Sequence, residues 1–191
     1  MSTYTLNLDS VVDLTDEQFF QLCQNNRDLT FERSALGELI IMPPTGAETG
    51  NREGRLGQQL YNWADIDGTG IAFSSSTGFK LPNGADRSPD AAWLKLERWQ
   101  ALTPEQRQRF APLCPNFVVE ILSPSDRLQI TQTKMQEYID NGAQLGWLIN
   151  RRDQQVEIYR LGHTVEVLDA PQSISGEPVL PGFRLNLGSI W

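Results

Sequence analysis

Histidine and cysteine are scarce in this chain of 191 residues, and their scarcity excludes several classes of enzyme. The one histidine, His163, falls in an expected turn, so a serine or cysteine hydrolase that relies on a histidine base is excluded. Cys23 and Cys114 form no CxxC pair and no disulfide framework, and with a single histidine they do not make a zinc site. This cysteine usage leads us to expect a reduced, cytoplasmic location.

Long hydrophobic runs and an excess of positive charge are also missing. The apolar stretches are far shorter than the roughly 20 residues that span a bilayer, so we expect no membrane protein. The 16 basic residues are outnumbered by 24 acidic ones, which argues against broad, nonspecific affinity for nucleic acid but leaves room for a local basic groove. The glycine-rich loops of nucleotide-binding motifs are absent as well, which argues against an enzyme that uses a nucleotide cofactor.

The pattern of apolar residues predicts alternating strands and helices. We find no repeat, low-complexity tract or flexible linker, and we therefore expect one domain over residues 1–191. Periodicity and turn signals predict helices at 15–26, 48–67, 97–110 and 126–141, and strands at 29–33, 38–42, 71–74, 79–81, 90–94, 117–122, 145–150, 155–161, 164–168 and 183–187. The expected fold class is α/β, a mixed β-sheet flanked by α-helices with an N-terminal helix and hairpin.

Two carboxylates stand where burial would ordinarily exclude them. Glu120 lies within the apolar strand 117–122, on the same face as Val118 and Leu122, and Asp90 begins the apolar strand 90–94. An unpaired buried carboxylate costs several kcal/mol, so each must be neutralised, ion-paired or bound to a cation. If the two strands are neighbours, the acids form an oxygen site suited to Mg²⁺, and the alternative is a buried salt bridge with an arginine.

A lysine on the next helix could reach these acids. Lys134 and Tyr138 are four residues apart within the expected helix 126–141, so they share one face of it. From that face, the lysine could extend back over the edge of the sheet toward the carboxylates.

Taken together, these motifs resemble a known family. Pro89-Asp90, then Val119-Glu120-Ile121-Leu122-Ser123-Pro124-Ser125 and the following Lys134, Tyr138 and Gly142, resemble the Uma-type family of the PD-(D/E)XK restriction-endonuclease-like superfamily. The segments 37–46, with Met42-Pro43-Pro44-Thr45-Gly46, and 180–183, with the final Trp191, are similar to the opening and closing patterns of that family. The resemblance extends from Leu14 to the end of the chain.

The resemblance implies a restriction-endonuclease-like fold and assigns roles to residues. It implies that Asp90 and Glu120 bind the metal and that Glu48 is the accessory acid. The superfamily motif expects a lysine two residues after the glutamate, where this chain has Leu122; the resemblance moves that role to Lys134, with Lys80 as a weaker candidate. A histidine that many relatives carry after the Pro-Pro-Thr-Gly turn is replaced here by the segment 48–50.

The expected activity is hydrolysis of phosphodiester bonds in nucleic acid, with DNA as the expected substrate. Mg²⁺ is the expected cofactor and Mn²⁺ its substitute. Four arginines flank the site segments and could bind phosphates: Arg52, Arg55, Arg87 and Arg127. A homodimer is expected because duplex cleavage needs two active sites, and the late strands 155–161 and 164–168 are the candidate surfaces.

Two other functions stay open at this point. One is a catalytically inactive nuclease fold that serves as a binding or assembly module, which the missing strand lysine and the acidic balance favour. The other is glycoside hydrolysis by two carboxylates, for which only Trp93 and Trp99 could offer an aromatic sugar platform.

Overall fold

The computed structural model describes residues 3–124 and 126–191 and is built around a six-stranded sheet. Its strands run in the order β11 (Glu166–Asp169), β10 (Gln155–Arg160), β9 (Leu145–Asn150), β8 (Phe117–Ile121), β7 (Ala91–Lys95) and β4 (Gly70–Ser74). β8 and β9 are parallel and every other pair is antiparallel, so the sheet is mixed. The expected α/β class is confirmed.

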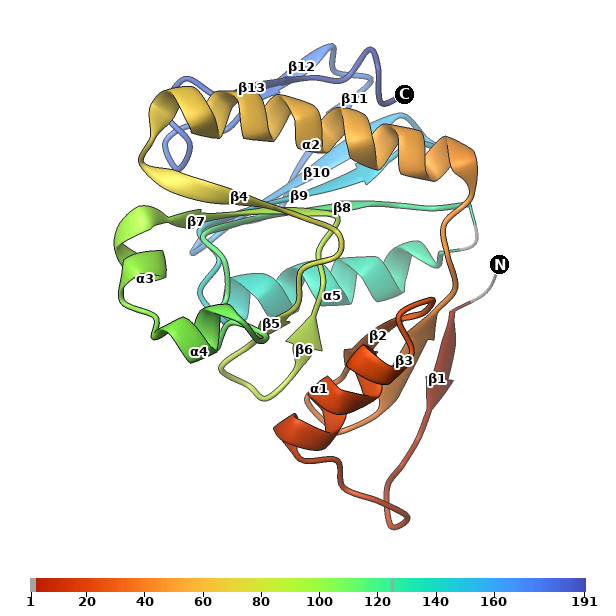
Figure 1. Ribbon diagram of the computed structural model, residues 1–191. Coiled ribbons are helices and arrows are strands. Elements are labelled where there is room, and N and C mark those ends of the chain that lie inside the picture. The colour runs from red at the N-terminus through yellow and green to blue at the C-terminus, as the bar shows by residue number, and fades with distance from the viewer. Residues whose placement is uncertain (1–2, 125) are drawn as a thin grey trace.

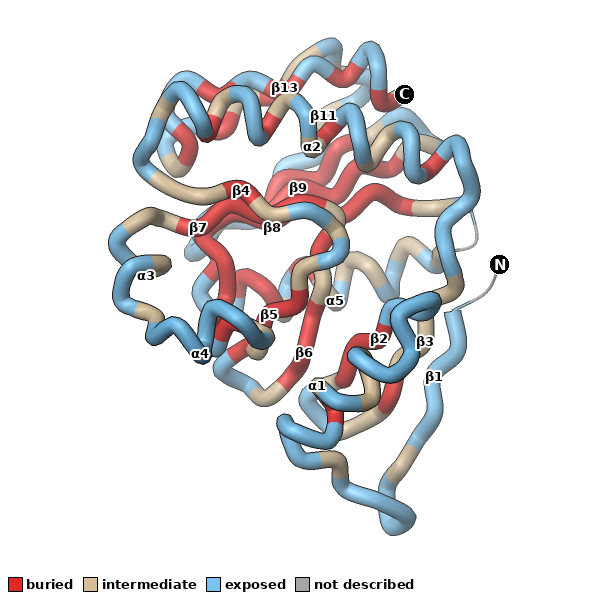
Figure 2. Tube along the Cα trace, viewed as in Figure 1, coloured by how far each residue is buried: buried red, intermediate tan, exposed pale blue. Residues whose placement is uncertain are grey.

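A helix covers each face of this sheet (Figure 1). α2 (Ala47–Asp67) packs Leu56, Leu60 and Ala64 against one face, together with the C-terminal segment that contains β12 (Ser173–Ser175) and β13 (Arg184–Asn186). α5 (Leu128–Asp140) packs Met135 and Ile139 against the other face. Figure 2 shows that β7, β8 and β9 are buried along most of their length. A carboxylate on these strands therefore lies next to the core.

A second sheet, at the N-terminal end of the chain, packs below the α5 side in Figure 1. Its order is β1 (Tyr4–Leu6), β3 (Leu39–Met42), β2 (Thr30–Arg33), β6 (Asp86–Arg87) and β5 (Phe79–Lys80). α1 (Asp16–Asn25) begins with a capping box formed by Thr15 and Gln18, and it buries Phe19. This sheet brings β2 and β6 within reach of the residues on α5.

Two expectations about the elements were wrong. The expected helix 97–110 is two short helices, α3 (Leu96–Gln100) and α4 (Pro104–Arg107), because Pro104 lacks the N–H that would continue a helix and instead begins a new one after Thr103. The expected edge strand 155–161 is not an edge, because β10 is paired on both sides and β11 forms that edge of the sheet. No described helix is long and apolar enough to cross a membrane.

Candidate active site

The two acids predicted from the sequence lie side by side. The register that pairs Ala91 with Val119 places Asp90 opposite Glu120, at the ends of β7 and β8. Residues two apart in a strand share a face, so both acids lie on the α5 side with Ala92 and Val118. The backbone N–H of Ile121 donates to Asp90 Oδ2 at 2.6 Å, which ties the two strand ends together.

Lys134 reaches back from α5 to Glu120. Its Nζ lies 2.8 Å from Glu120 Oε1, and the hydroxyl of Tyr138 donates to the same oxygen at 3.0 Å. Glu120 is only 7% exposed, and its partner is a lysine rather than the arginine that the alternative interpretation required. Leu122, at the motif's usual lysine position, is buried and only its backbone is bonded, to Ile149. The ammonium group thus approaches the glutamate from the helix instead of the strand.

A third acid, which the sequence analysis missed, holds Lys134 from the other side. Glu32 Oε1 lies 2.8 Å from Lys134 Nζ and accepts the backbone N–H of Ser88 at 2.8 Å. Glu32 Oε2 accepts from Arg87 at 3.1 Å, and Arg87 also donates to Glu137 at 2.6 Å. Glu32 lies in the predicted strand 29–33, but that strand also contains Thr30 and Arg33 and lacks the apolar run that marked Glu120.

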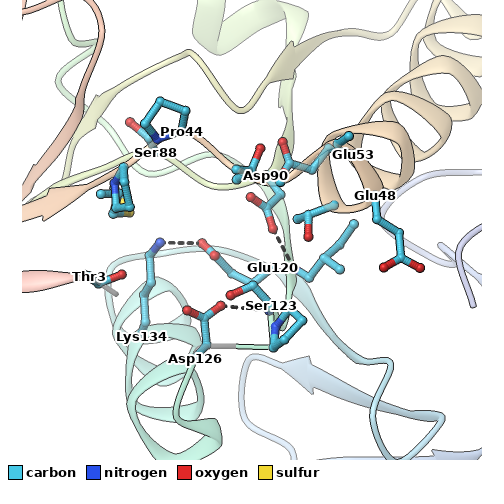
Figure 3. Close-up of a pocket in the computed structure, with 18 residues that line it drawn as sticks. Thr3, Pro44, Glu48, Glu53, Ser88, Asp90, Glu120, Ser123, Asp126 and Lys134 are labelled. Carbon is cyan, nitrogen blue, oxygen red and sulfur yellow. Dashed lines mark hydrogen bonds and ion pairs between the residues drawn. The ribbon is translucent and has the colours of Figure 1, made fainter. Parts of the chain in front are cut away.

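Beside these residues, at the end of the sheet, lies a pocket of about 410 Å³ (Figure 3). Asp90, Glu120 and Lys134 line it together with the loop before α2 and the first turns of that helix. Glu53 of α2 lines it as well and points toward Asp90 in Figure 3, with Ser75 as its hydrogen-bond donor at 3.3 Å. Glu53 continues the buried stripe of Leu56 and Leu60 by one helical turn, and this periodicity could have identified it.

Glu48 lies at the rim of this pocket, away from the other acids. Its side chain is 73% exposed and pairs with Arg52 at 2.5 Å, and it points away from Asp90 in Figure 3. Arg52 also lowers its pKa. The structure therefore brings together Asp90, Glu120 and Lys134 of the predicted set, and does not bring Glu48 to them.

The remaining basic candidates lie elsewhere. Arg87 is buried between Glu32 and Glu137, so its expected place on a phosphate-binding rim was wrong. Lys80 pairs with Asp16 at 2.5 Å and with Asp86 in the N-terminal sheet, outside the pocket. Arg127 is exposed just before α5, and Arg55 is exposed on α2 beside a different depression. Among the contacts of the described residues, Arg52 is the one of these four arginines that pairs with a residue lining the pocket.

The acids in and beside the pocket outnumber the cations, and this excess is reflected in the pKa values of the acids. Burial, and next to it the charges of Glu120 and Glu53, raise the pKa of Asp90 well above its usual value. Burial also raises the pKa of Glu120, and Lys134 only partly offsets this. Burial raises the pKa of Glu53 likewise. For Glu32, Lys134 and Arg87 outweigh burial and lower the pKa.

Lys134 itself stays charged. Burial alone would lower its pKa, but Glu120 and Glu32 together raise it above that of a free lysine. An ammonium group held in this way can donate hydrogen bonds and offer positive charge, and it cannot act as a general base near neutral pH.

A protein-family model described as "Uma2: Putative restriction endonuclease" matches residues 16–188 of the chain. The chain belongs to the Uma2 family. A solved structure of "a putative nuclease belonging to DUF820" from Anabaena variabilis is similar to this Uma2 chain with a TM-score of 0.74 and 19% sequence identity, over 93% of this chain and 97% of that one. The restriction-endonuclease-like fold is thereby confirmed. None of the curated proteins matches the chain.

Proposed function

We propose that this Uma2 protein is a Mg²⁺-dependent endonuclease that hydrolyses phosphodiester bonds of nucleic acid, with DNA as the substrate. The observation that carries the proposal is the excess of carboxylates around one pocket. Among the residues that line it, the acids Glu53, Asp90 and Glu120 have Lys134 as their cation, and Glu32 also binds that lysine. A divalent cation is the simplest partner for the acids that remain without one, and the family supports a nuclease.

The donor atoms fit Mg²⁺. Within residues 3–124 and 126–191, Glu120 Oε2 and Asp90 Oδ1 accept no hydrogen bond, so each acid has one oxygen available to a cation. The described residues hold no group of three or more His, Cys, Asp or Glu side chains spaced for a metal. This also suits Mg²⁺, which keeps several waters and usually takes only one or two carboxylates from the protein. Mn²⁺ would substitute.

The roles follow from these positions. Asp90 and Glu120 would hold the ion, which when bound supplies Lewis acidity and an activated water. Glu53, rather than Glu48, would be the accessory acid, since it is the α2 carboxylate that faces Asp90. Lys134 would donate to the phosphate oxygens and stabilise the charge that develops there, which needs a fixed, protonated amine.

Cleavage of supercoiled plasmid with and without Mg²⁺ tests the proposal. We expect the unaltered chain to nick or cut the plasmid only with Mg²⁺ or Mn²⁺, and Asp90→Asn and Glu120→Gln to lose about 10³-fold in rate, the equivalent of several kcal/mol. Glu157→Gln is the matched control, because Glu157 is equally buried but is bonded by Gln132 and Tyr159 and is not among the residues that line the pocket. Unchanged cleavage by Asp90→Asn would refute the assignment.

The alternative function is a nuclease fold that binds without cutting. The observation in its favour is the buried Leu122 in place of the strand lysine. Calorimetric titration with Mg²⁺ separates the two: binding that Asp90→Asn abolishes supports the enzyme, and no binding supports the module. The glycoside hydrolase alternative loses its sugar platform. Trp93 is buried in the core between α2 and the sheet, and Trp99 packs against Phe73 and is not among the residues that line the pocket.

A further inference from the structure

Beside the acidic pocket lies a cluster in which positively charged side chains outnumber carboxylates. Two arginines, Arg52 on α2 and Arg151 after β9, share one carboxylate, that of Glu48, at 2.5 and 3.6 Å. The two arginine side chains are 13% and 15% exposed, whereas that of Glu48 is 73% exposed. Two well-packed guanidinium groups thus depend on one carboxylate that stands mostly in water.

The arginines are incompletely satisfied by this carboxylate. Arg151 Nε is buried and has no hydrogen-bond partner among the residues that the structure describes. Burial and the neighbouring charge of Arg52 lower the pKa of Arg151, and Glu48 offsets this only in part. A buried N–H donor without a partner is costly, so the site favours an additional acceptor that carries negative charge.

Arg52 keeps its orientation without the Glu48 carboxylate. Its Nε donates to the backbone carbonyl of Ile190 at 2.9 Å, and its Nη1 donates to the backbone carbonyl of Glu48 at 3.1 Å. The Glu48 side chain is therefore free to swing away, since an exposed ion pair of this kind is screened by water and adds little net stability.

The arginine pair lies at the same edge of the sheet as the acidic pocket. β8 and β9 are parallel, so Arg151 follows the end of β9 just as Ser123 and Pro124 follow the end of β8. Ser123, Pro124 and Glu48 all line the pocket. A chain of phosphates with one group at Asp90 and Glu120 would carry a neighbouring group past Glu48.

We propose that Arg52 and Arg151 form a binding site for a phosphodiester group of the nucleic acid backbone next to the one that is cut, and that Glu48 occupies this site until the substrate displaces it. The inference rests on the proposed function. It gives Glu48 a role opposite to that of an accessory acid, because its carboxylate competes with the substrate instead of assisting the reaction. Arginine suits such a site because its planar fork donates two parallel hydrogen bonds to a phosphate.

Fluorescence anisotropy with a labelled DNA duplex tests the site in an Asp90→Asn background, which keeps the duplex intact. We expect Arg151→Gln to weaken binding about tenfold and to lower the slope of log K against log[salt] by about one, as one lost phosphate contact does. Glu48→Gln is expected to tighten binding several-fold, and in the otherwise unaltered chain it retains plasmid cleavage. Arg160→Gln is the matched control. In the register of β9 and β10, Arg160 lies opposite Leu145, at the end of the sheet away from Arg151.

The outcomes separate the inference from the proposed function. If the unaltered chain neither binds nor cuts nucleic acid, the proposed function fails and the inference fails with it. If the chain binds and cuts but Arg151→Gln behaves like Arg160→Gln, only the inference is overturned. Loss of cleavage in Glu48→Gln also overturns the inference, because it would make Glu48 the accessory acid.

Discussion

Two clusters of charged residues lie next to each other at one end of the six-stranded sheet. Acids outnumber cations in one cluster, and cations outnumber acids in the other. In the acidic pocket, carboxylates that include Asp90 and Glu120 outnumber their cations, and several of them have raised pKa values. In the arginine pair, two guanidinium groups share the exposed carboxylate of Glu48. The first group suits a cation and the second suits an anion. A metal ion and the phosphate chain that it acts on would satisfy both groups at once.

The difference also explains how a chain with a net charge of −8 can bind nucleic acid. Total charge governs nonspecific affinity, but the groups that meet the substrate are few and local. Arg87, which the sequence suggested for phosphate binding, instead forms ion pairs with Glu32 and Glu137. Arg151, to which the sequence assigned no role, pairs with Glu48 at the pocket's rim.

The largest effect is expected from Lys134→Met, which removes the ammonium group that Glu32 and Glu120 bind. Glu32 and Glu120 then remain buried without it, which costs about 3 to 5 kcal/mol of unfolding free energy. Cleavage falls by about 10² to 10³-fold, as it does when a fixed donor to a developing oxyanion is lost. Plasmid cleavage and thermal melting measure the two effects. Lys80→Met, whose lysine pairs with Asp16 outside the pocket, serves as the control and should cleave normally.

A smaller effect is expected from Glu32→Gln, because Glu32 acts on the substrate only through Lys134. The glutamine keeps the shape but loses the charge that helps to raise the pKa of Lys134. We expect a tenfold to hundredfold loss in kcat and a shift of the alkaline limb of the pH profile to lower pH. A purely structural role would lower the melting temperature and leave that limb in place. Glu38→Gln is the control, because Glu38 lies in the turn between β2 and β3 and accepts from Ser34 there.

The elements that were predicted well are those whose pattern is local. α2 and α5 have long apolar stripes, and β8 is apolar on both faces, so periodicity located them and with them Glu120 and Lys134. β6 was missed because its two residues, Asp86 and Arg87, are buried through ion pairs with residues of β2 that lie more than fifty positions away in sequence. Such a pairing leaves no trace in local hydropathy, and Glu32 went unrecognised for the same reason.

A stability effect of opposite sign is expected from Asp90→Asn in the absence of metal. The folded-state pKa of Asp90 lies above the unfolded value of 3.8, so the unaltered chain loses stability as pH rises from about 4 through the folded-state pKa. The asparagine does not titrate and can still accept from Ile121. The variant should therefore match the unaltered chain near pH 4 and be about 1 to 3 kcal/mol more stable at pH 8. Thermal melting in EDTA measures this difference, and Mg²⁺ should close the gap by stabilising only the unaltered chain.

The smallest effect compares the two acids of α2 directly. Glu53 faces Asp90 inside the acidic pocket, whereas Glu48 pairs with Arg52 at its rim. If the two groups are as distinct as their contacts indicate, Glu53→Gln weakens Mg²⁺ binding about tenfold, the lower end of the range for a carboxylate that supports metal ligands. Glu48→Gln should leave Mg²⁺ affinity within twofold. Titration calorimetry of both variants decides the matter: equal losses would mean that one continuous acidic site spans the pocket and its rim, and that the arginine pair is part of the metal centre rather than a separate site for phosphate.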